Sequence, residues 1–357
     1  MAGGAVCGVE VAWRWRRAKA SRRTDDNAAF MQAILSVTVP FFALVLCGWL
    51  AARRHVLPES AIPGLNSYVL YFALPCMLFR FGSTTPVLEL LNPVVLGVYL
   101  FAALVIVFFT ISISLSDRVG MKDASFGALV AAFPNTGFMG VPLLVALMGK
   151  GAAGPVICSI LADLFVTSSL CIALAQAARA GSGQVGSAGA AARRALRGAL
   201  SNPLPWSIAL GAVFSVMRLQ LPGPVQSIVD MLAASATPVA LFTIGAVLYR
   251  AGQHAKKNDL PTPLSDFLPV ALVKLFLHPA LVLVLGLAAR YLGAPLSSFE
   301  LTVLTLAAAL PSASNVSLLA ERFGADNGRI ARIIMSSTVL AFATFSTAAW
   351  LFGVKTV

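Results

Sequence analysis

The sequence repeats uncharged, apolar stretches that are each long enough to form a helix across a membrane, and this feature most limits how the chain can fold. A helix needs about 20 apolar residues to cross the hydrocarbon core of a bilayer. We therefore predict an all-α, polytopic membrane protein with ten transmembrane helices. The predicted spans cover residues 31–52, 61–82, 94–116, 124–149, 153–178, 203–219, 225–249, 267–290, 300–320 and 329–353.

The composition agrees with a bilayer as the solvent of the chain. Hydrophobic residues make up 58% of the sequence and charged residues 11%, whereas an ordinary soluble domain has roughly 25% charged residues. A soluble fold with so few charges could not cover its apolar surface. A soluble globular enzyme and a disordered chain are therefore both excluded.

The formal net charge of +12 comes mainly from short loops between the apolar stretches. Cytoplasmic loops of membrane proteins carry such an excess of Lys and Arg, and no RNA- or DNA-binding motif accompanies it, so we expect no nucleic-acid partner. If the first span begins outside, fourteen Lys and Arg residues lie in inside loops and five in outside loops. This orientation places both ends of the ten-helix unit outside a cytoplasmic (inner) membrane.

The N-terminal tail conflicts with that orientation, because residues 1–30 carry six basic residues that favour the inside. Its first segment is too short and too polar for the apolar core of a signal peptide. Two interpretations stay open. Either Met31 is the natural start and residues 1–30 come from a start assigned too far upstream, or the chain has a genuine basic tail.

The segment 179–202 divides the predicted spans into two groups of five, 31–178 and 203–353. It is rich in glycine, alanine and serine and carries four arginines, a composition typical of a flexible cytoplasmic linker.

The two halves resemble each other in their second helices. The segments LNSYVLYFALPCMLFRFG (65–82) and IVDMLAASATPVALFTIG (228–245) share the pattern P-x-x-L-F-x-x-G at an offset of 163 residues. An odd number of spans in each repeat turns the second copy upside down, and inverted repeats are typical of secondary transporters. The alternative is a chance match between two apolar segments.

The fourth predicted span has a cluster of prolines and glycines that predicts a broken helix. Pro134 and Pro142 lack the amide hydrogen that a helix needs at each position, and Gly137 and Gly140 lie between them. Unwound backbone inside a membrane is tolerated only where it is buried in protein or lines a cavity. We therefore expect breaks at both prolines.

The ninth predicted span has a matching break at Pro311, which is followed by a run of serines and Asn315. If the two breaks cross, we expect a substrate site there, with the positive ends of half-helices suited to a carboxylate. The alternative is a pair of simple kinks, with serines bonded back to their own helices. The predicted substrate-binding residues are Asn135, Thr136, Gly137, Ser314 and Asn315.

Two charged residues lie well inside predicted spans. Asp163 is near the middle of the fifth span, where a charge is costly and therefore functional by default. It could carry a proton, or it could make a structural hydrogen bond to a neighbouring helix. Lys274 is a possible charge partner for it, although its long stem could also carry the ammonium group to the membrane surface.

These residues carry a resemblance to a known family. The segments FPNTGFMGVPLL and LPSASNVSLLAERFG, together with the opening MQAILSVTVPFFALVLCGWLAARRHVL, resemble the auxin efflux carrier family over about residues 31–353. That family includes bacterial malate and malonate permeases and plant auxin exporters. The resemblance implies two inverted five-helix repeats, with helices four and nine crossed at their breaks beside the substrate. It also implies a crossover domain and a scaffold domain that often forms homodimers.

The central linker of 24 residues departs from the long cytoplasmic loop of the plant exporters. It favours the bacterial permease branch and makes auxin a less suitable substrate. We expect a secondary active or facilitative transporter that moves a small organic anion, a dicarboxylate or a hydrophobic monocarboxylate, by alternating access. The alternative is a sodium-coupled symporter on the same fold.

Enzyme chemistry has no support in the sequence. No nucleophile–base pair is visible, the three histidines are far apart, and neither an HExxH nor a CxxC motif occurs. We therefore expect no enzymatic activity, no metal site and no cofactor.

Overall fold

The computed structural model describes residues 31–86, 92–180, 200–257 and 263–354. The tail 1–30 and most of the linker 179–202 lie outside the described residues, so the predictions for them stay predictions. Where the chain is described, it is helical and has no β-strand, in agreement with the predicted all-α class. Several helices contain a wider π-helical turn, which the sequence analysis did not predict.

The first half begins with a helix at Met31–Arg53. The elements that follow are α2 (Ala61–Tyr68), η1 (Val69–Ala73), α3 (Leu74–Thr84), α5 (Pro93–Ser114), α6 (Met121–Ala132), η2 (Thr136–Gly140), α7 (Val141–Met148), η3 (Lys150–Ala152), α8 (Ala153–Ala162), η4 (Asp163–Thr167) and α9 (Ser168–Ala180).

The second half follows the linker. Its elements are α11 (Pro203–Met217), α12 (Gly223–Lys257), α13 (Leu264–Leu272), η5 (Val273–Leu277), α14 (His278–Tyr291), α15 (Ser298–Ala309), α16 (Val316–Arg322) and α17 (Asn327–Leu351).

Seven helices among the described residues are long and apolar enough to cross a membrane, and they match seven of the ten predicted spans. The other three predicted spans, 124–149, 203–219 and 300–320, contain only shorter apolar helices. Two of these spans are interrupted, one at Pro134 and the other at Pro311. The third is α11, which has 15 residues. The count of ten spans therefore remains a prediction.

Side-chain caps explain where several helices begin. Asn92 precedes α5, and its side-chain oxygen accepts hydrogen bonds from the amides of Val94 and Val95. Ser297 and Glu300 form a reciprocal capping box at the start of α15. The amide of Asn92 also donates to Glu300 over 2.9 Å, so the two helix starts are tied together.

One group of helices packs through glycine and is here called the glycine-packed bundle: the helix Met31–Arg53, α2–α3, α11 and α12. A Cβ atom on Gly48 would lie 1.8 Å from the carbonyl oxygen of Phe242, and one on Gly245 would lie 1.9 Å from that of Val45. Gly82 and Gly211 also bring α3 and α11 close together, since a Cβ atom on them would lie 2.9 Å from the carbonyl oxygen of Ile208 and 2.4 Å from that of Phe79. Such contacts between backbones need small residues.

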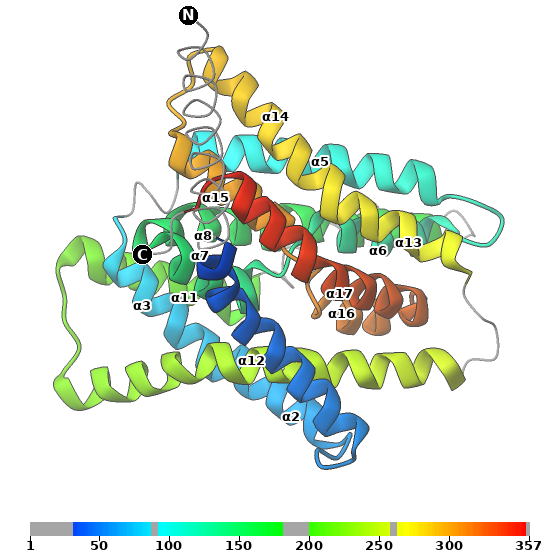
Figure 1. Ribbon diagram of the computed structural model, residues 1–357, viewed down its shortest axis with the longest axis horizontal. Helices are drawn as coiled ribbons and strands as arrows, with labels where there is room; N and C mark the ends of the chain where they lie inside the picture. Colours follow the sequence, from blue (N-terminus) through cyan, green and yellow to red (C-terminus); the bar gives the residue numbers. More distant parts are fainter. Residues whose placement is uncertain (1–30, 87–91, 181–199, 258–262, 355–357) are drawn as a thin grey trace, which may run out of the picture.

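The remaining helices form a second group, here called the crossover bundle: α5 to α9 and α13 to α17. Within it α5 packs on α6, α8 and α14, while α15 packs on α14 and α8. The long helix α12 runs along one side of the molecule, α5 and α14 lie on the opposite side, and α17 lies between them (Figure 1). Because α17 contacts both α12 and α13, it joins the two bundles.

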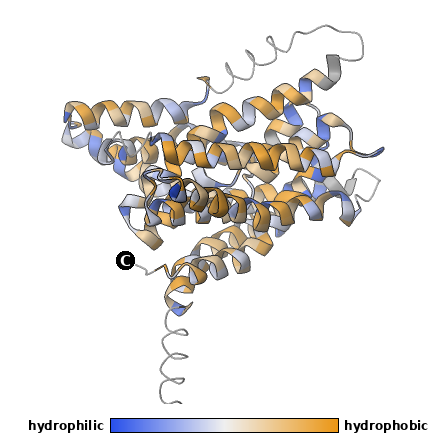
Figure 2. Ribbon diagram, turned by 90° about the horizontal axis from the view of Figure 1, so that it is seen from above, coloured by the Kyte–Doolittle hydropathy of each residue, from blue (hydrophilic) through white to orange (hydrophobic). Residues whose placement is uncertain are grey.

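The outer surfaces of the helices are apolar. Hydrophobic residues extend along most of the helices, and many hydrophilic residues gather at their ends (Figure 2). Large apolar side chains that would be costly in water are exposed on several helices, including Phe101, Phe108 and Val339. The chain is therefore a multi-pass membrane protein.

Candidate functional site at the helix crossing

The two interrupted helices meet at their breaks. Helix α6 ends at Ala132 and helical structure resumes at Thr136, while α15 ends at Ala309 and resumes at Val316. The amide of Asn135 donates to the carbonyl of Pro311 over 2.8 Å, and the amide of Ala313 donates to that of Phe133 over 3.0 Å. These bonds form an isolated antiparallel bridge between Pro134 and Ser312. Each break thus provides hydrogen-bond partners for some of the backbone groups that the other break leaves unpaired.

Pro142 does not break the fourth span, contrary to the prediction. It lies in the first turn of α7, inside the continuous helical run Thr136–Met148. The π-helical turn η2 directly precedes it and widens the helix, which accommodates a residue without an amide hydrogen. The interruptions therefore lie at Pro134 and Pro311.

A small cavity of about 20 Å³ lies at the crossing. Asn135, Thr136, Gly137 and Asn315 line it, so four of the five predicted substrate-binding residues come together. Ser314 is buried but does not line the cavity, and its carbonyl accepts a bond from Ser317. The volume suits about one water molecule, so the cavity is too small in this conformation for an organic anion.

The opposite wall of the cavity comes from the glycine-packed bundle. Leu74 at the start of α3 and Leu204 at the start of α11 both line the cavity. Apolar side chains on this side leave the polar groups of the breaks as the hydrogen-bonding surface. The cavity is therefore formed between the two bundles, and a movement of one against the other would change its size.

Two amide side chains at the cavity have buried oxygen atoms without a hydrogen-bond partner. These atoms are Oδ1 of Asn135 and Oδ1 of Asn315. A buried polar atom without a partner costs free energy, so a polar ligand or water is expected there. Each amide also carries an NH₂ group that can donate two hydrogen bonds. The two amides can thus orient a carboxylate.

Asp163 lies at the start of the π-helical turn η4 and is fully buried. The hydroxyl of Tyr99 donates to its carboxylate over 2.7 Å, and the hydroxyl of Thr167 donates over 3.1 Å. Hydrogen bonds of this kind replace part of the hydration that a carboxylate loses in a membrane. Both interpretations of Asp163 therefore remain open, because a bonded carboxylate can also carry a proton.

Lys274 lies in the π-helical turn η5 and is also fully buried, so the alternative in which it reaches the membrane surface is wrong. Its ammonium group donates to the carbonyl of Ala308 and lies 3.4 Å from Nδ1 of His278. Ala308 is in the last turn of α15, where carbonyls lack helical partners and the helix end is negative. Lys274 thus caps the half-helix before the break.

Lys274 and Asp163 carry opposite charges in the same bundle but form no direct ion pair. Lys274 is therefore a charge partner that does not contact Asp163.

Tyr99 and Ser337 are functional candidates that sequence reasoning missed. Tyr99 contacts Asp163, and the hydroxyl of Ser337 accepts a bond from the amide of Ser312 in the second break. A buried tyrosine needs a partner for its hydroxyl, so a tyrosine inside the apolar stretch 94–116 was the available signal for the first. Ser337 had no signal, because serines are frequent in these spans.

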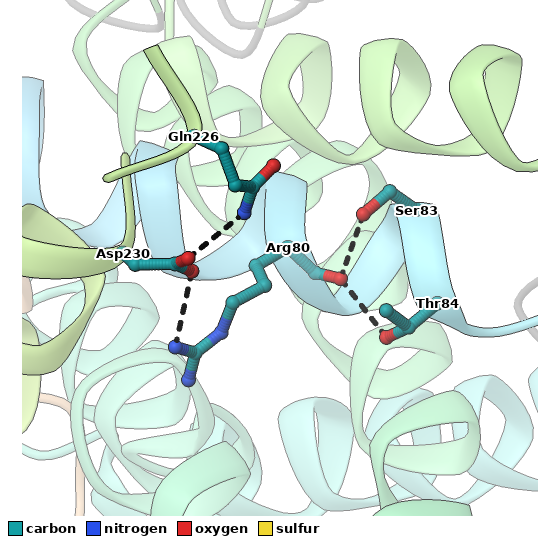
Figure 3. A network of polar contacts seen from close by, with 5 residues as sticks. All are labelled: Arg80, Ser83, Thr84, Gln226 and Asp230. Carbon is teal, nitrogen blue, oxygen red and sulfur yellow. Dashed lines mark hydrogen bonds and ion pairs between the residues drawn. The ribbon is translucent and has the colours of Figure 1, made fainter. Parts of the chain in front are cut away.

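A different polar group lies in the glycine-packed bundle (Figure 3). The guanidinium of Arg80 on α3 is 3.6 Å from the carboxylate of Asp230 on α12, and Gln226 donates to the same carboxylate over 3.0 Å. The carbonyl of Arg80 accepts bonds from Ser83 and Thr84. This group links the two repeated helices at one end of the bundle.

Metal binding has no support in the described part of the chain. Among these residues no three His, Cys, Asp or Glu side chains lie close enough together to hold a metal ion.

Comparison with known families gives one match over most of the chain. The family described as "Membrane transport protein" matches residues 33–351. This range contains both breaks, Asp163 and Lys274.

Comparison with individual proteins points the same way. The chain is 30% identical over 316 residues to a "Putative malonate transporter" of Rhizobium meliloti (strain 1021). The matched region covers 88% of this chain and 94% of that protein. It is 24% identical over 297 residues to "Uncharacterized transporter YfdV" of Escherichia coli (strain K12), covering 80% and 87%. It is 28% identical over 144 residues to "Auxin efflux carrier component 8" of Arabidopsis thaliana, covering 38% of each.

Proposed function

The chain belongs to the membrane transport protein family, the auxin efflux carrier family that its motifs resemble, and from this premise we propose that it is a secondary carrier of small organic anions in the cytoplasmic membrane. The observation that carries the proposal is the crossing itself. Two interrupted helices meet there around a cavity with two unpartnered amide oxygens. Such paired broken helices are the usual binding site of secondary transporters.

The substrate in this proposal is a small dicarboxylate such as malonate. The amide groups of Asn135 and Asn315 would each donate a hydrogen bond to a carboxylate oxygen. The helical run Thr136–Met148 would direct its positive N-terminal end at the same charge. The similarity to the "Putative malonate transporter" of Rhizobium meliloti supports this substrate class.

Transport in this proposal requires alternating access. The cavity of about 20 Å³ corresponds to a closed conformation, and the leucine wall from the glycine-packed bundle must move away before an anion can enter. The crossover bundle would rock or slide against the glycine-packed bundle, which would open the site to each side in turn.

Two glycine contacts support an inverted repeat of five helices. Gly48 and Gly211 are 163 residues apart, as are Gly82 and Gly245 in the shared P-x-x-L-F-x-x-G pattern. The pairs Gly48–Gly245 and Gly82–Gly211 hold the first helix to α12 and α3 to α11. A two-fold exchange of the halves converts one contact into the other.

Asp163 is the proposed proton carrier. It is fully buried and bonded to Tyr99, and it lies in the same bundle as the crossing. Sodium coupling is the alternative. Sodium requires several oxygen ligands, and acidic side chains are scarce in the spans. Uptake that persists at full rate in sodium-free proteoliposomes would remove this alternative.

The direct test is malonate uptake by purified protein in proteoliposomes. We expect Asn135→Ala and Asn315→Ala each to lower the initial rate about tenfold to hundredfold, because a hydrogen bond to a charged group contributes about 1.5–3 kcal/mol. Asn327→Ala is the matched control, since Asn327 also has a buried amide oxygen without a partner but does not line the cavity. Wild-type rates in both crossing variants would refute the site.

A further inference from the structure

Two side chains link Asp163 to Lys274 inside the crossover bundle. The hydroxyl of Tyr99 donates to the carboxylate of Asp163 over 2.7 Å, and the ring of Tyr99 packs against that of His278 with centroids 5.9 Å apart. Nδ1 of His278 lies 3.4 Å from the ammonium nitrogen of Lys274. All four side chains are fully buried. The two opposite charges therefore lie at the ends of one group of side chains, here called the buried charge cluster.

The Lys274 end of the buried charge cluster lies beside the second break. The ammonium group donates to the carbonyl of Ala308, three residues before Pro311. The turn η5, which carries Lys274, packs on both α6 and α15, the two half-helices that lead into the breaks. A charge acts through space, so the ammonium can attract an anion at the crossing while its hydrogens stay bonded to these partners.

His278 does not add a second charge to the cluster. The ammonium of Lys274 donates, so Nδ1 of the imidazole must accept, and the ring then carries its hydrogen on Nε2 and is neutral. Nε2 is buried and has no hydrogen-bond partner, so a charge on the ring would lack compensation. The positive charge of the cluster therefore belongs to Lys274.

The Asp163 end suits a group that gains and loses a proton. Its side-chain partners are the hydroxyls of Tyr99 and Thr167. A hydroxyl can donate to a carboxylate and can accept from a protonated carboxyl group. Among the described residues Asp163 has no ion pair, which would favour the ionised form alone. The same partners can therefore satisfy both states of Asp163.

Other titratable groups near the cluster are few. In the elements that pack on η4 and η5, Cys158 on α8 and Cys171 on α9 are buried beside Tyr99 on α5, and thiols and phenols are uncharged near neutral pH. The charged side chains described in the other packed helices lie within the first six residues of α6, α13, α15 and α17 or in the last turn of α14. Asp163 is thus the one carboxyl group in the described cluster.

On the basis of the proposed function, we propose that the charge of Lys274 couples anion binding at the crossing to the protonation of Asp163. With Asp163 ionised, the cluster is neutral overall. When a proton from the aqueous side binds its carboxylate, the charge of Lys274 is no longer compensated, and a carboxylate at the crossing compensates it instead. Bound anion favours the proton to the same extent, because coupling between two sites is reciprocal. The anion and the proton therefore cross together.

The test is the dissociation constant of malonate, measured by isothermal titration calorimetry with purified protein between about pH 5.5 and pH 8.5. Malonate itself titrates, so each variant is compared with the wild type at the same pH. At alkaline pH we expect Asp163→Asn to bind about fivefold or more tightly than the wild type, because asparagine keeps the cluster positive. At acidic pH the two should agree, since Asp163 is then protonated.

Lys274 is tested in the Asp163→Asn background. The double variant Asp163→Asn, Lys274→Gln has a neutral cluster, and its glutamine can still donate to the carbonyl of Ala308. We expect it to lose the tight binding of Asp163→Asn by about fivefold or more at every pH. The matched control is Asp163→Asn, Lys150→Gln, which removes an exposed lysine and should bind as tightly as Asp163→Asn.

Two outcomes would refute the inference. One is an equal dissociation constant for the wild type and Asp163→Asn over the whole pH range, a comparison that does not depend on the folding of the double variant. The other is tight binding by the Lys274→Gln double variant, which would leave Lys274 a structural role at Ala308. Failure of the proposed site differs from both, because Asn135→Ala would then bind malonate as tightly as the wild type at every pH.

Discussion

Two groups of charged side chains in this protein differ in burial and in the helices that carry them. In the glycine-packed bundle, Arg80 and Asp230 are 41% and 45% exposed and lie 3.6 Å apart (Figure 3). In the crossover bundle, Asp163 and Lys274 are fully buried and bond to other groups instead of to each other. An exposed pair contributes about 0–1 kcal/mol, whereas buried charges are costly unless fully compensated.

The difference shows where the chain retains costly charges. Lys274 bonds to Ala308 beside the second break, and Asp163 begins a π-helical turn in a helix that packs on both α6 and α15. In the glycine-packed bundle, the backbones of two helices touch at Gly48 and Gly245. The Arg80–Asp230 pair of this bundle lies at the surface. Asp163 and Lys274 thus accompany interrupted helices, where backbone groups lack their usual partners.

The largest expected effect is that of Lys274→Met. It keeps an apolar stem of similar length but leaves the carbonyl of Ala308 without its donor and Asp163 without a compensating charge. We expect a loss of about 3–5 kcal/mol of unfolding free energy, because removal of one buried charge leaves the opposite one uncompensated, measured by titration with SDS in mixed micelles. Lys150→Met, at an exposed position, is the control and should change little. Equal stability of the two variants would mean that the buried ammonium does not support the break.

The next effect is that of Gly48→Ala in the other bundle. A Cβ atom would lie 1.8 Å from the carbonyl oxygen of Phe242, so the first helix and α12 must separate. We expect a cost of about 1–3 kcal/mol from overpacking, measured in the same titration. Gly97→Ala is the matched control, because nothing lies within 4 Å of its added Cβ. An unchanged Gly48→Ala variant would show that this bundle is loosely packed.

The third effect concerns Asp163→Asn, which removes the charge and keeps the shape. Tyr99 can still donate to the remaining oxygen, so we expect a folded protein. If Asp163 carries the proton, a proton gradient should no longer accelerate malonate uptake, and the rate with the gradient should fall about tenfold, a change of about 1.4 kcal/mol in the barrier. Uptake in proteoliposomes with and without an inward proton gradient measures this. Stimulation that survives in the variant would assign Asp163 a structural role.

The sequence predicted the backbone features of the crossing better than its side-chain contacts. Pro134 and Pro311 interrupt their helices because proline lacks an amide hydrogen. This property belongs to the residue itself, so the sequence alone reveals it. Pro142 has the same property but lies in a continuous helix, since the π-helical turn before it adjusts the backbone. Such turns depend on packing between helices, so spacing alone does not reveal them.

The partners of the buried charges could not be predicted for a similar reason. Tyr99 and Asp163 are 64 residues apart, and Lys274 and Ala308 are 34 residues apart. A single sequence indicates that a buried charge needs a partner, but it does not indicate which neighbouring helix provides one. The helix order and both interruptions were therefore predictable, whereas the hydrogen bonds around Asp163 and Lys274 required coordinates.

The smallest expected effect is that of Arg80→Gln. Both side chains of the Arg80–Asp230 pair are nearly half exposed, so water and salt screen their attraction. We expect a loss of less than about 1 kcal/mol and unchanged malonate uptake. A double-mutant cycle with Asp230→Asn isolates the interaction of the pair from other effects of each change. The contrast between the two groups would be wrong if this coupling energy were close to the unfolding free energy lost in the Lys274→Met variant. The exposed pair would then stabilise the fold as strongly as the buried charge of Lys274.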